Sequence, residues 1–330
     1  MISIIIPVYN CQKYIHDCLN SILNQTVNNF EVLCIDDAST DNSLDILKQY
    51  AARDSRIKVI QSNQHLGAGP ARNLGISKAS GDFLLFCDAD DIYPSYALSK
   101  MKTVLAESSC DMCIGNIKFM SPDMSHPIFP PFPLLSSHID EFKIISPCDD
   151  PSLWIPWYHQ RVMFKKSFLV ENNIYYPNLL RGQDPPMLAK SLCLADSVVT
   201  IPDTVYKYRA SSSIKKFSHQ QFEDYIKHIK ETIRIFDSFN WKQQADIYIQ
   251  LMAFFTDGFS TFKAYPAKER KQLIDYCLTC ISERRIVNDT PPYFFDKNIQ
   301  NRLISMKYGI FIYGFYRLYT LYGNKIKKYF

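Results

Sequence analysis

The chain has 330 residues, of which 47% are hydrophobic and 21% are charged. This composition excludes a disordered chain, a collagen-like repeat and a coiled coil. The formal net charge of +4 is unevenly distributed, because residues 1–214 contain 18 Lys and Arg against 22 Asp and Glu, whereas residues 215–330 contain 19 against 11. A basic C-terminal part of this kind is typical of a segment that touches an anionic surface.

Neither end of the sequence has the pattern of a secretory signal peptide or of a membrane-spanning helix. Met1 is followed directly by the apolar run 2–6 and then by Pro7, without the basic region of a secretory signal peptide. The longest uncharged stretch near the C-terminus has nine residues, 308–316, about half of the ~20 that a spanning helix needs. We therefore expect a cytoplasmic protein without a spanning helix.

The first third of the chain alternates strand-like apolar runs with helix-like amphipathic segments. The strand-like runs are 2–6, 30–35, 57–61 and 83–87, and the helix-like segments are near 12–24, 42–53, 68–79 and 94–107. This alternation predicts β-α-β units and a parallel sheet. In such sheets ligands gather at the carboxyl ends of the strands, which here are the segments 7–10, 36–37, 63–65 and 88–91.

The glycines argue against a dinucleotide-binding Rossmann domain. The first strand is followed by Pro-Val-Tyr-Asn-Cys-Gln-Lys, and the glycines Gly67, Gly69 and Gly75 come after the third strand with the wrong spacing. A Walker A lysine is also absent from the sequence. We therefore expect that any phosphate is bound without a glycine-rich cradle.

The rest of the chain has a mixed pattern followed by a helical one. A strand at 111–120 precedes a proline-rich stretch, the segment 154–164 and short strands near 197–201 and 204–209. Proline at that density favours extended chain over helix. Residues 218 to about 285 have apolar positions three and four apart, which predicts helices.

Acidic residues are concentrated at the predicted ligand-binding edge of the sheet. Asp36, Asp37, Asp88, Asp90 and Asp91 follow two of the strands, and such carboxylates repel one another unless a cation lies between them. In an Asp-x-Asp pair at a strand end, one carboxylate can reach a ribose hydroxyl or water while the other binds Mg²⁺ or Mn²⁺ on phosphate oxygens. An acidic surface turn is the alternative interpretation of the pair alone.

Five segments resemble, in order and separation, motifs of the family-two inverting glycosyltransferases of the GT-A fold, as found in bacterial polysaccharide synthesis. They are Ser-Ile-Ile-Ile-Pro-Val-Tyr-Asn at 3–10, Ile-Asp-Asp-Ala-Ser-Thr-Asp-Asn-Ser at 35–43, Gly-Ala-Gly-Pro-Ala-Arg-Asn-Leu-Gly at 67–75, Gly-Asp-Phe-Leu-Leu-Phe-Cys-Asp-Ala-Asp-Asp at 81–91 and Tyr-Lys-Tyr-Arg at 206–209. The resemblance implies an α/β fold with a mixed, mostly parallel sheet flanked by helices. It also implies transfer of a sugar from a nucleotide diphosphate, most often UDP, to an acceptor hydroxyl with inversion of configuration.

The resemblance assigns four residues near the first two strands to the nucleotide. Pro7, Tyr9 and Asp37 belong to the pocket of the base, with Tyr9 packing on uracil and Asp37 accepting from its ring N–H. An ionised aspartate only accepts hydrogen bonds, which suits an imide N–H. Asp36 lies in the same acidic turn with a less specific role, and Tyr9 could instead be only a wall residue.

The resemblance assigns four further residues to the sugar diphosphate. In this assignment Asp88 contacts the ribose and the donor sugar, and Asp90 binds the metal, Mn²⁺ or Mg²⁺. Arg72 contacts either a phosphate or the acidic residues of the pocket. Arg209 follows a strand near the predicted pyrophosphate and is a further candidate to bind it. The alternative for Arg72 is an internal counter-ion for Asp36 or Asp88.

An inverting displacement needs a base that takes the proton of the acceptor hydroxyl. Where the family usually has a Glu-Asp pair, this chain has Gln183-Asp184, so one carboxylate is missing and Asp184 becomes the candidate for the catalytic base. Asp184 before Pro185 is also a good helix N-cap, and a helix N-terminus would favour its ionised form. His159 lies where relatives close a loop over the diphosphate or the acceptor, although it could be incidental.

The C-terminal tail has a basic and an aromatic side when residues 302–328 are placed on a helix. One side carries Ile304, Phe311, Phe315, Leu318, Tyr322 and Ile326, and the other carries Arg302, Arg317, Lys327 and Lys328. Such a helix is typical of one lying in a membrane interface. The alternative is a helix docked on its own domain, and Gly309, Gly314 and Gly323 weaken any helix here.

Together these features predict a metal-dependent inverting glycosyltransferase in three parts. Residues 1–120 form the nucleotide-sugar-binding half of the GT-A domain, 121–214 the acceptor-binding half, and 215–330 a helical region with the basic tail. The expected partners are a nucleotide-sugar donor, a glycan or lipid-linked glycan acceptor and the anionic inner face of the cell membrane, but no nucleic acid. A catalytically inactive nucleotide-sugar-binding or scaffold protein is the alternative, for which Gln183 is the only sign.

Overall fold

The structure is a computed structural model that describes residues 1–128, 138–150, 153–210, 218–258 and several positions between 272 and 284. Its contacts divide the chain into the units Met1–Arg284 and Arg285–Phe330. The predicted tail helix at 302–328 lies outside the described residues. Among the helices of the described part, none is long and apolar enough to cross a membrane.

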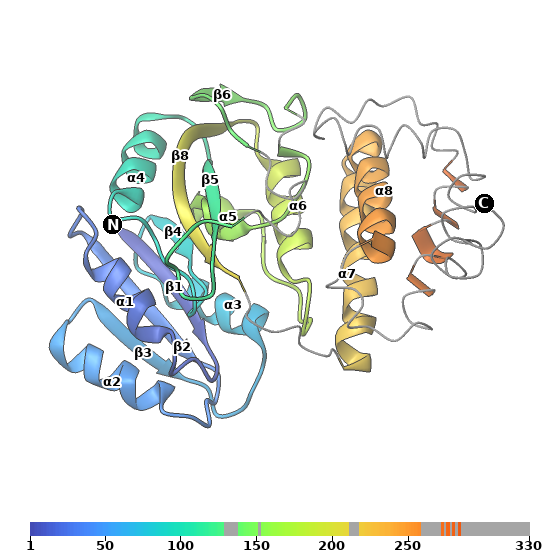
Figure 1. Cartoon of the computed structure of the whole chain (residues 1–330). Helices are drawn as coiled ribbons and strands as arrows, with labels where there is room; N and C mark the ends of the chain where they lie inside the picture. The colour runs from blue at the N-terminus through green and yellow to red at the C-terminus, as the bar shows by residue number, and fades with distance from the viewer. Residues whose placement is uncertain are drawn as a thin grey trace. The chain divides into compact units, whose positions relative to one another are not determined.

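The first third of the chain folds as the predicted series of β-α-β units (Figure 1). Its elements are β1 (Ile2–Val8), α1 (Ile15–Leu23), β2 (Phe30–Asp36), α2 (Ser43–Arg53), β3 (Ile57–Gln61), α3 (Ala68–Lys78), β4 (Phe83–Phe86) and α4 (Ala97–Glu107). Strand β1 pairs in parallel with β2 and β4, and β2 pairs in parallel with β3. The carboxyl ends of β1, β2 and β4 therefore meet at one edge of the sheet, as the sequence predicts.

The second part of the chain extends the same sheet with both strand directions. Its elements are β5 (Met112–Met120), β6 (Lys143–Ile145), the short 3-10 turn η2 (His159–Arg161), β7 (Val162–Lys165), α5 (Lys166–Glu171), α6 (Asp184–Leu194), β8 (Val198–Arg209), α7 (His219–Ser238) and α8 (Lys242–Gly258). The strand order is β3-β2-β1-β4-β7-β5-β8-β6. Strand β7 is antiparallel to both β4 and β5, and β5 is parallel to β8. The predicted mixed, mostly parallel sheet is confirmed.

Strand β8 differs from its predicted form, and three short elements, β6, β7 and α5, were not predicted. Strand β8 is one element where two short strands were expected, because it continues through Pro202 with a register shift against β5 rather than ending there. A proline cannot donate to the ladder, and the carbonyl of Pro202 instead accepts a hydrogen bond from the Asn116 amide. Strand β6 was not predicted, since its three residues are too few to show a period.

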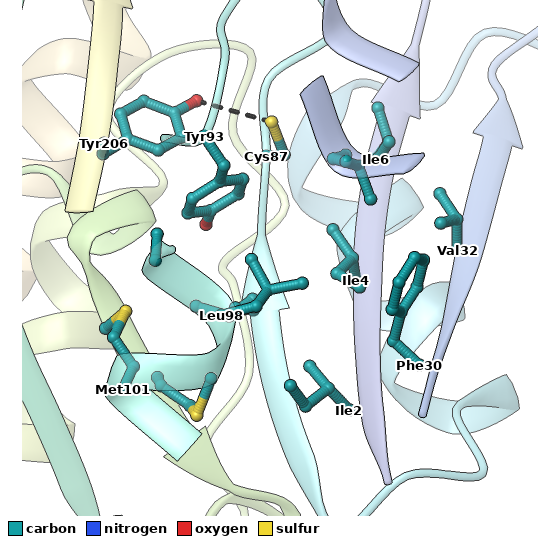
Figure 2. Packing of buried hydrophobic residues seen from close by; sticks show 14 of the residues in the cluster. Ile2, Ile4, Ile6, Phe30, Val32, Cys87, Tyr93, Leu98, Met101 and Tyr206 are labelled. Carbon is teal, nitrogen blue, oxygen red and sulfur yellow. Dashed lines mark hydrogen bonds between the residues drawn. The ribbon is translucent and has the colours of Figure 1, made fainter. Parts of the chain in front are cut away.

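The sheet has a buried apolar layer on each face. Ile2, Ile4 and Ile6 of β1 pack in one layer with residues of α1, α2 and α4, whereas Ile5 packs in the other with residues of α3, α5 and α6. This division follows from the alternation of side chains along a strand. Figure 2 shows the first layer, in which Ile2, Ile4 and Ile6 of β1 share one cluster with Leu98 of α4. A strand buried on both faces reads as a continuous apolar run, which explains the sequence of β1.

Candidate active site

Asp37 follows β2 and fixes the loop that comes after β3. Its Oδ1 accepts a hydrogen bond from the backbone N–H of Leu66 at 2.8 Å, and its Oδ2 accepts one from Gly67 at 2.7 Å. The carboxylate is buried. The side chain of His65 adds a third contact, with Nδ1 at 2.9 Å from Oδ2. Asp37 is therefore held rigidly at the carboxyl edge of the sheet.

The other predicted base-pocket residues lie beside Asp37. Pro7 is in β1 opposite Ile35, so Tyr9 projects from the loop that follows the strand. Tyr9 is 42% exposed, and the ring of His65 is stacked on its ring. Asp36 is fully buried, and Ser39 donates to its Oδ2 at 3.4 Å while its Oδ1 has no hydrogen-bond partner among the described residues.

Arg72 of α3 joins two carboxylates that are far apart in the chain. Its Nη2 donates to Oδ1 of Asp88 at 2.6 Å, and its Nη1 lies 3.7 Å from Oδ1 of Asp184. The guanidinium is buried beside the ring of Tyr176. Burial by itself would lower the pKa of Arg72, but Asp88 and Asp184 hold it above its usual range. The structure thus agrees with Arg72 as the counter-ion of Asp88 and shows no contact with Asp36.

The second carboxylate oxygen of Asp88 also accepts a hydrogen bond. The Gln160 amide donates to Oδ2 of Asp88 at 2.7 Å, and the backbone N–H of Asp88 donates to the Tyr206 hydroxyl at 3.1 Å. The backbone carbonyl of Gln160 accepts a hydrogen bond from the Tyr93 hydroxyl at 2.8 Å. Gln160 was not among the predicted site residues, since nothing in its local sequence indicates this contact.

Asp184 is the first residue of α6 and not its N-cap, because Gln183 takes the cap position. The sequence predicted Asp184 as the N-cap, so the predicted N-cap is one residue too late in the chain. Gln183 turns its amide inward to donate to the carbonyl of Leu179 at 2.7 Å. The side chain that replaces the expected acid is thus used within its own loop, where a carboxylate could not donate.

The carboxylate of Asp184 is paired with His159 and ionised. Nδ1 of His159 lies 2.9 Å from Oδ2 of Asp184. Burial acts to raise the pKa of Asp184, but His159 and Arg72 together lower it to about 2. The sequence predicted a lowered pKa from the helix N-terminus, whereas in the structure His159 and Arg72 are the main cause. Asp184 is therefore in its proton-accepting form throughout the neutral range.

His159 lies in a rigid aromatic environment. Its ring is completely buried and packs edge to face on Phe86 and Tyr176, with centroid distances of 5.4 and 5.2 Å. Neither ring nitrogen meets the geometry of a hydrogen bond with the described residues, so the contact of Nδ1 with Asp184 rests on its distance of 2.9 Å. His159 and Asp184 come together because η2 leads into β7, which is inserted beside β4. The sequence predicted His159 near the diphosphate or the acceptor but did not indicate this pairing.

The end of β8 fixes the turn that contains Asp90 and Asp91. The Arg209 backbone donates to Oδ1 of Asp91, and the Tyr206 hydroxyl donates to Oδ2 at 2.8 Å. The Arg209 side chain donates to the carbonyl of Asp90 at 2.6 Å and to Asp17 at 2.8 Å. Arg209 is therefore committed to positioning the acidic turn, and its contact with a pyrophosphate remains a prediction.

Burial raises the pKa of Asp91 well above its usual range, and the charges of Asp90 and Asp88 act in the same direction. Among the described residues, no group of three or more His, Cys, Asp or Glu is arranged to hold a metal ion. Mg²⁺ is commonly held by one or two carboxylates together with substrate phosphates. The half-buried Asp90, on a turn anchored by Arg209, supplies a hard oxygen ligand of that kind, so the residues present fit Mn²⁺ or Mg²⁺.

Helix α7 supports the loop that leads to Asp184. Oδ2 of Asp224 accepts from the backbone N–H of Leu180 at 2.9 Å. Gly182 has a φ of +77°, and a Cβ there would lie 2.4 Å from Nδ1 of His228, so only glycine fits. His228 is buried, and its Nε2 lies 3.1 Å from the Tyr248 hydroxyl of α8. The position of Asp184 thus depends on both helices of the 218–258 segment.

The comparisons with known proteins identify the family. The family model of glycosyl transferase family 2 matches residues 3–169, and the chain belongs to this family. It is 30% identical over 226 residues to the glycosyltransferase GlyG of Streptococcus pneumoniae, a match that covers 64% of this chain and 71% of GlyG. It is 32% identical over 208 residues to the poly(ribitol-phosphate) beta-glucosyltransferase of Bacillus spizizenii, but this match covers 61% of the chain and only 30% of that protein.

Solved structures confirm the GT-A fold. The chain superimposes on Staphylococcus aureus TarS 1–349 in complex with UDP with a TM-score of 0.69 at 22% identity, covering 93% of this chain and 87% of that one. A second likeness, with a TM-score of 0.52 at 16% identity and 87% of each chain covered, is to the mannosyltransferase PcManGT of Pyrobaculum calidifontis in complex with GDP-Man and Mn²⁺. Both fold neighbours therefore bind nucleotides, and the second binds a divalent metal.

Proposed function

We propose that this glycosyltransferase moves a sugar from a UDP-sugar to an acceptor hydroxyl with inversion, with the help of Mn²⁺ or Mg²⁺. The observation that carries the proposal is Arg72, which holds Asp88 at 2.6 Å and lies 3.7 Å from Asp184. This contact brings a residue assigned to the donor close to the candidate base, which supports a common site for the two. The fold neighbour TarS, which was solved with UDP, supports UDP as the nucleotide.

The carboxyl ends of β1, β2 and β4 would bind the donor. Tyr9 would pack on the base and Asp37 would accept from its ring N–H, while Pro7 and Asp36 shape the same pocket. Asp88, kept in place by Arg72 and Gln160, would receive the ribose and the donor sugar.

Asp90 would hold the metal. The metal, when bound, offsets the negative charge that develops on the departing diphosphate. Arg72 carries a fixed positive charge at the same edge, and Arg209 keeps the acidic turn in place.

Asp184 would take the proton of the acceptor hydroxyl on one of its carboxylate oxygens. His159 would orient this carboxylate through Oδ2, and Arg72 would keep it ionised through Oδ1. An oriented, ionised carboxylate is the form that a general base requires. Asp184 alone would therefore act as the general base, at the position where the family usually has a pair of acidic residues.

The acceptor would be a glycan or a lipid-linked glycan presented at the cytoplasmic face of the membrane. The name of the relative that transfers glucose to poly(ribitol-phosphate) supports a bacterial surface polymer as the acceptor class. The basic composition of residues 215–330 supports binding to an anionic membrane surface.

The test is thermal unfolding with UDP, with and without Mn²⁺, followed by a donor-hydrolysis assay. UDP with Mn²⁺ should raise the unfolding temperature more than UDP with EDTA, because the Asp37 and Asp90 contacts both contribute to the affinity. Asp90→Asn should abolish the metal-dependent part, while Asp45→Asn on the exposed surface of α2 should leave it unchanged.

Equal shifts with Mn²⁺ and with EDTA would contradict the metal assignment. Slow hydrolysis of a UDP-sugar with Mn²⁺ would support the enzyme. Binding of UDP-sugars without any hydrolysis or transfer would favour the inactive binding or scaffold protein.

A further inference from the structure

His65, in the loop between β3 and α3, lies against two residues of the proposed base pocket. Its imidazole ring is stacked on the ring of Tyr9, with centroids 3.9 Å apart and planes inclined by 25°. Its Nδ1 lies 2.9 Å from Oδ2 of Asp37. The proposed function gives no role to this side chain.

These two contacts are those that the proposed function gives to the nucleobase. Uracil would present a flat ring to Tyr9 and a ring N–H to Asp37, and a histidine can present the same combination. The imidazole therefore imitates the base in shape and in the position of its donor atom.

We propose that His65 occupies the place of the nucleobase in the unliganded chain and leaves it when the donor binds. The inference rests on the proposed function, because it assumes that a base binds to Tyr9 and Asp37. His65 then lowers the affinity of the site, since a ligand must first displace the histidine. The apparent affinity is reduced in proportion to the fraction of chains in which His65 has left the site.

The surroundings of His65 allow this movement. The side chain of His65 is 45% exposed and Tyr9 is 42% exposed, so the imidazole can turn into solvent without unpacking the core. Asp37 is different, because its carboxylate is buried and fixed by the N–H groups of Leu66 and Gly67. The acceptor thus stays in place while the histidine moves.

The contacts of His65 are also weak enough to be exchanged. The imidazole is 45% exposed although Asp37 is buried, so water can replace the histidine side of their contact, and a stacked pair of rings that is half open to water contributes little to stability. The uracil of UDP forms the same two contacts, and the diphosphate of UDP adds further ones. UDP would therefore displace His65 from the site.

The experiment measures binding of UDP, uridine and inorganic pyrophosphate to the full chain with Mn²⁺ by calorimetry. We expect His65→Ala to bind UDP and uridine about three- to tenfold more tightly than the wild type, because the competitor is gone. Pyrophosphate, which has no base, should bind both proteins equally. His16→Ala is the matched control. His16 is also an exposed histidine beside a tyrosine, Tyr50, but it lies on α1 and contacts neither Tyr9 nor Asp37 in the proposed base pocket.

A second measurement follows His65 directly by NMR of histidine side chains. The resonances that His65→Ala removes should shift when the wild type is titrated with UDP and stay in place with pyrophosphate. Unchanged resonances with saturating UDP would contradict the displacement.

The outcomes separate the inference from the proposed function. If the wild type binds UDP and His65→Ala binds it equally or more weakly, His65 does not compete with the base, and the inference is wrong while the proposed donor stands. A gain for pyrophosphate equal to that for UDP would also overturn it. If neither protein binds UDP, the proposed donor and the inference both fail.

Discussion

At the scale of single residues, the site is organised around charges that neutralise one another. Arg72 contacts Asp88 and lies near Asp184, and His159 contacts the second oxygen of Asp184. Buried charges are tolerated when they are paired in this way. The pairing also explains why Asp184, which burial would make a weaker acid, is instead ionised.

The variant Asp184→Asn tests the proposed base. Asparagine has almost the same shape but cannot accept the acceptor proton, so UDP binding should persist while sugar transfer falls by on the order of 10²–10⁴. Kinetics of transfer and calorimetry of UDP binding would measure the two effects.

The control for this variant is Asp196→Asn, which alters an exposed aspartate beyond the other end of α6. It should leave transfer and UDP binding unchanged. Transfer by Asp184→Asn within a few-fold of the wild type would mean that the base is another group.

At the scale of elements, distant segments hold the catalytic loops. The end of β8 holds Asp91 through Tyr206 and Arg209, and α7 holds the loop before α6 through Asp224 and His228. Helix α7 itself is preceded by the N-cap Ser218, which forms a complete capping box with Gln221, a local signal that is visible in the sequence. The contacts that α7 makes with the catalytic loop are not visible there.

The buried His228 predicts a pH dependence of stability. Burial and the charge of Arg181 lower the pKa of His228 to about 3, below its ordinary value of about 6.5. Between these values the unfolded chain binds a proton that the folded chain does not, so the free energy of unfolding falls as the pH decreases below about 6.5. From pH 7.5 to pH 5 this group alone should cost about 2 kcal/mol.

Denaturant unfolding of the wild type and of His228→Gln at both pH values measures this cost. Glutamine does not titrate, so the variant should lose about 2 kcal/mol less than the wild type on acidification. His16→Gln, at an exposed position, should behave as the wild type does. The same loss in His228→Gln and in the wild type would show that His228 is not the group that takes up the proton.

At the scale of the whole molecule, the charge of the chain is divided between two regions. Residues 1–214 have a net charge of −4, from 18 basic and 22 acidic residues, and residues 215–330 have +8, from 19 and 11. A basic region with aromatic residues suits an anionic bilayer surface, where each Lys or Arg contributes about 1 kcal/mol. Membrane binding by the tail is a prediction from the sequence, because residues 302–328 lie outside the described part.

Removal of the residues after 297 tests the membrane prediction. The full chain should sediment with anionic vesicles and be released by salt, because screening weakens the attraction. The truncated chain should stay in solution and still bind UDP. Neutral vesicles are the control, and a full chain that ignores anionic vesicles, or a truncated chain that unfolds, would place the tail in the protein's own core.

The sequence by itself determined the order of the first elements, the family and the edge of the sheet at which the acidic motifs meet. These features could be predicted because the apolar run of β1 and the motif around Asp88 are formed by residues that are adjacent in the sequence. Only the tertiary structure decided that His159 pairs with Asp184, that His65 stacks on Tyr9 and that β7 lies antiparallel beside β4. These contacts join segments distant in sequence, so they depend on how the crossovers pack, and no local pattern carries that information.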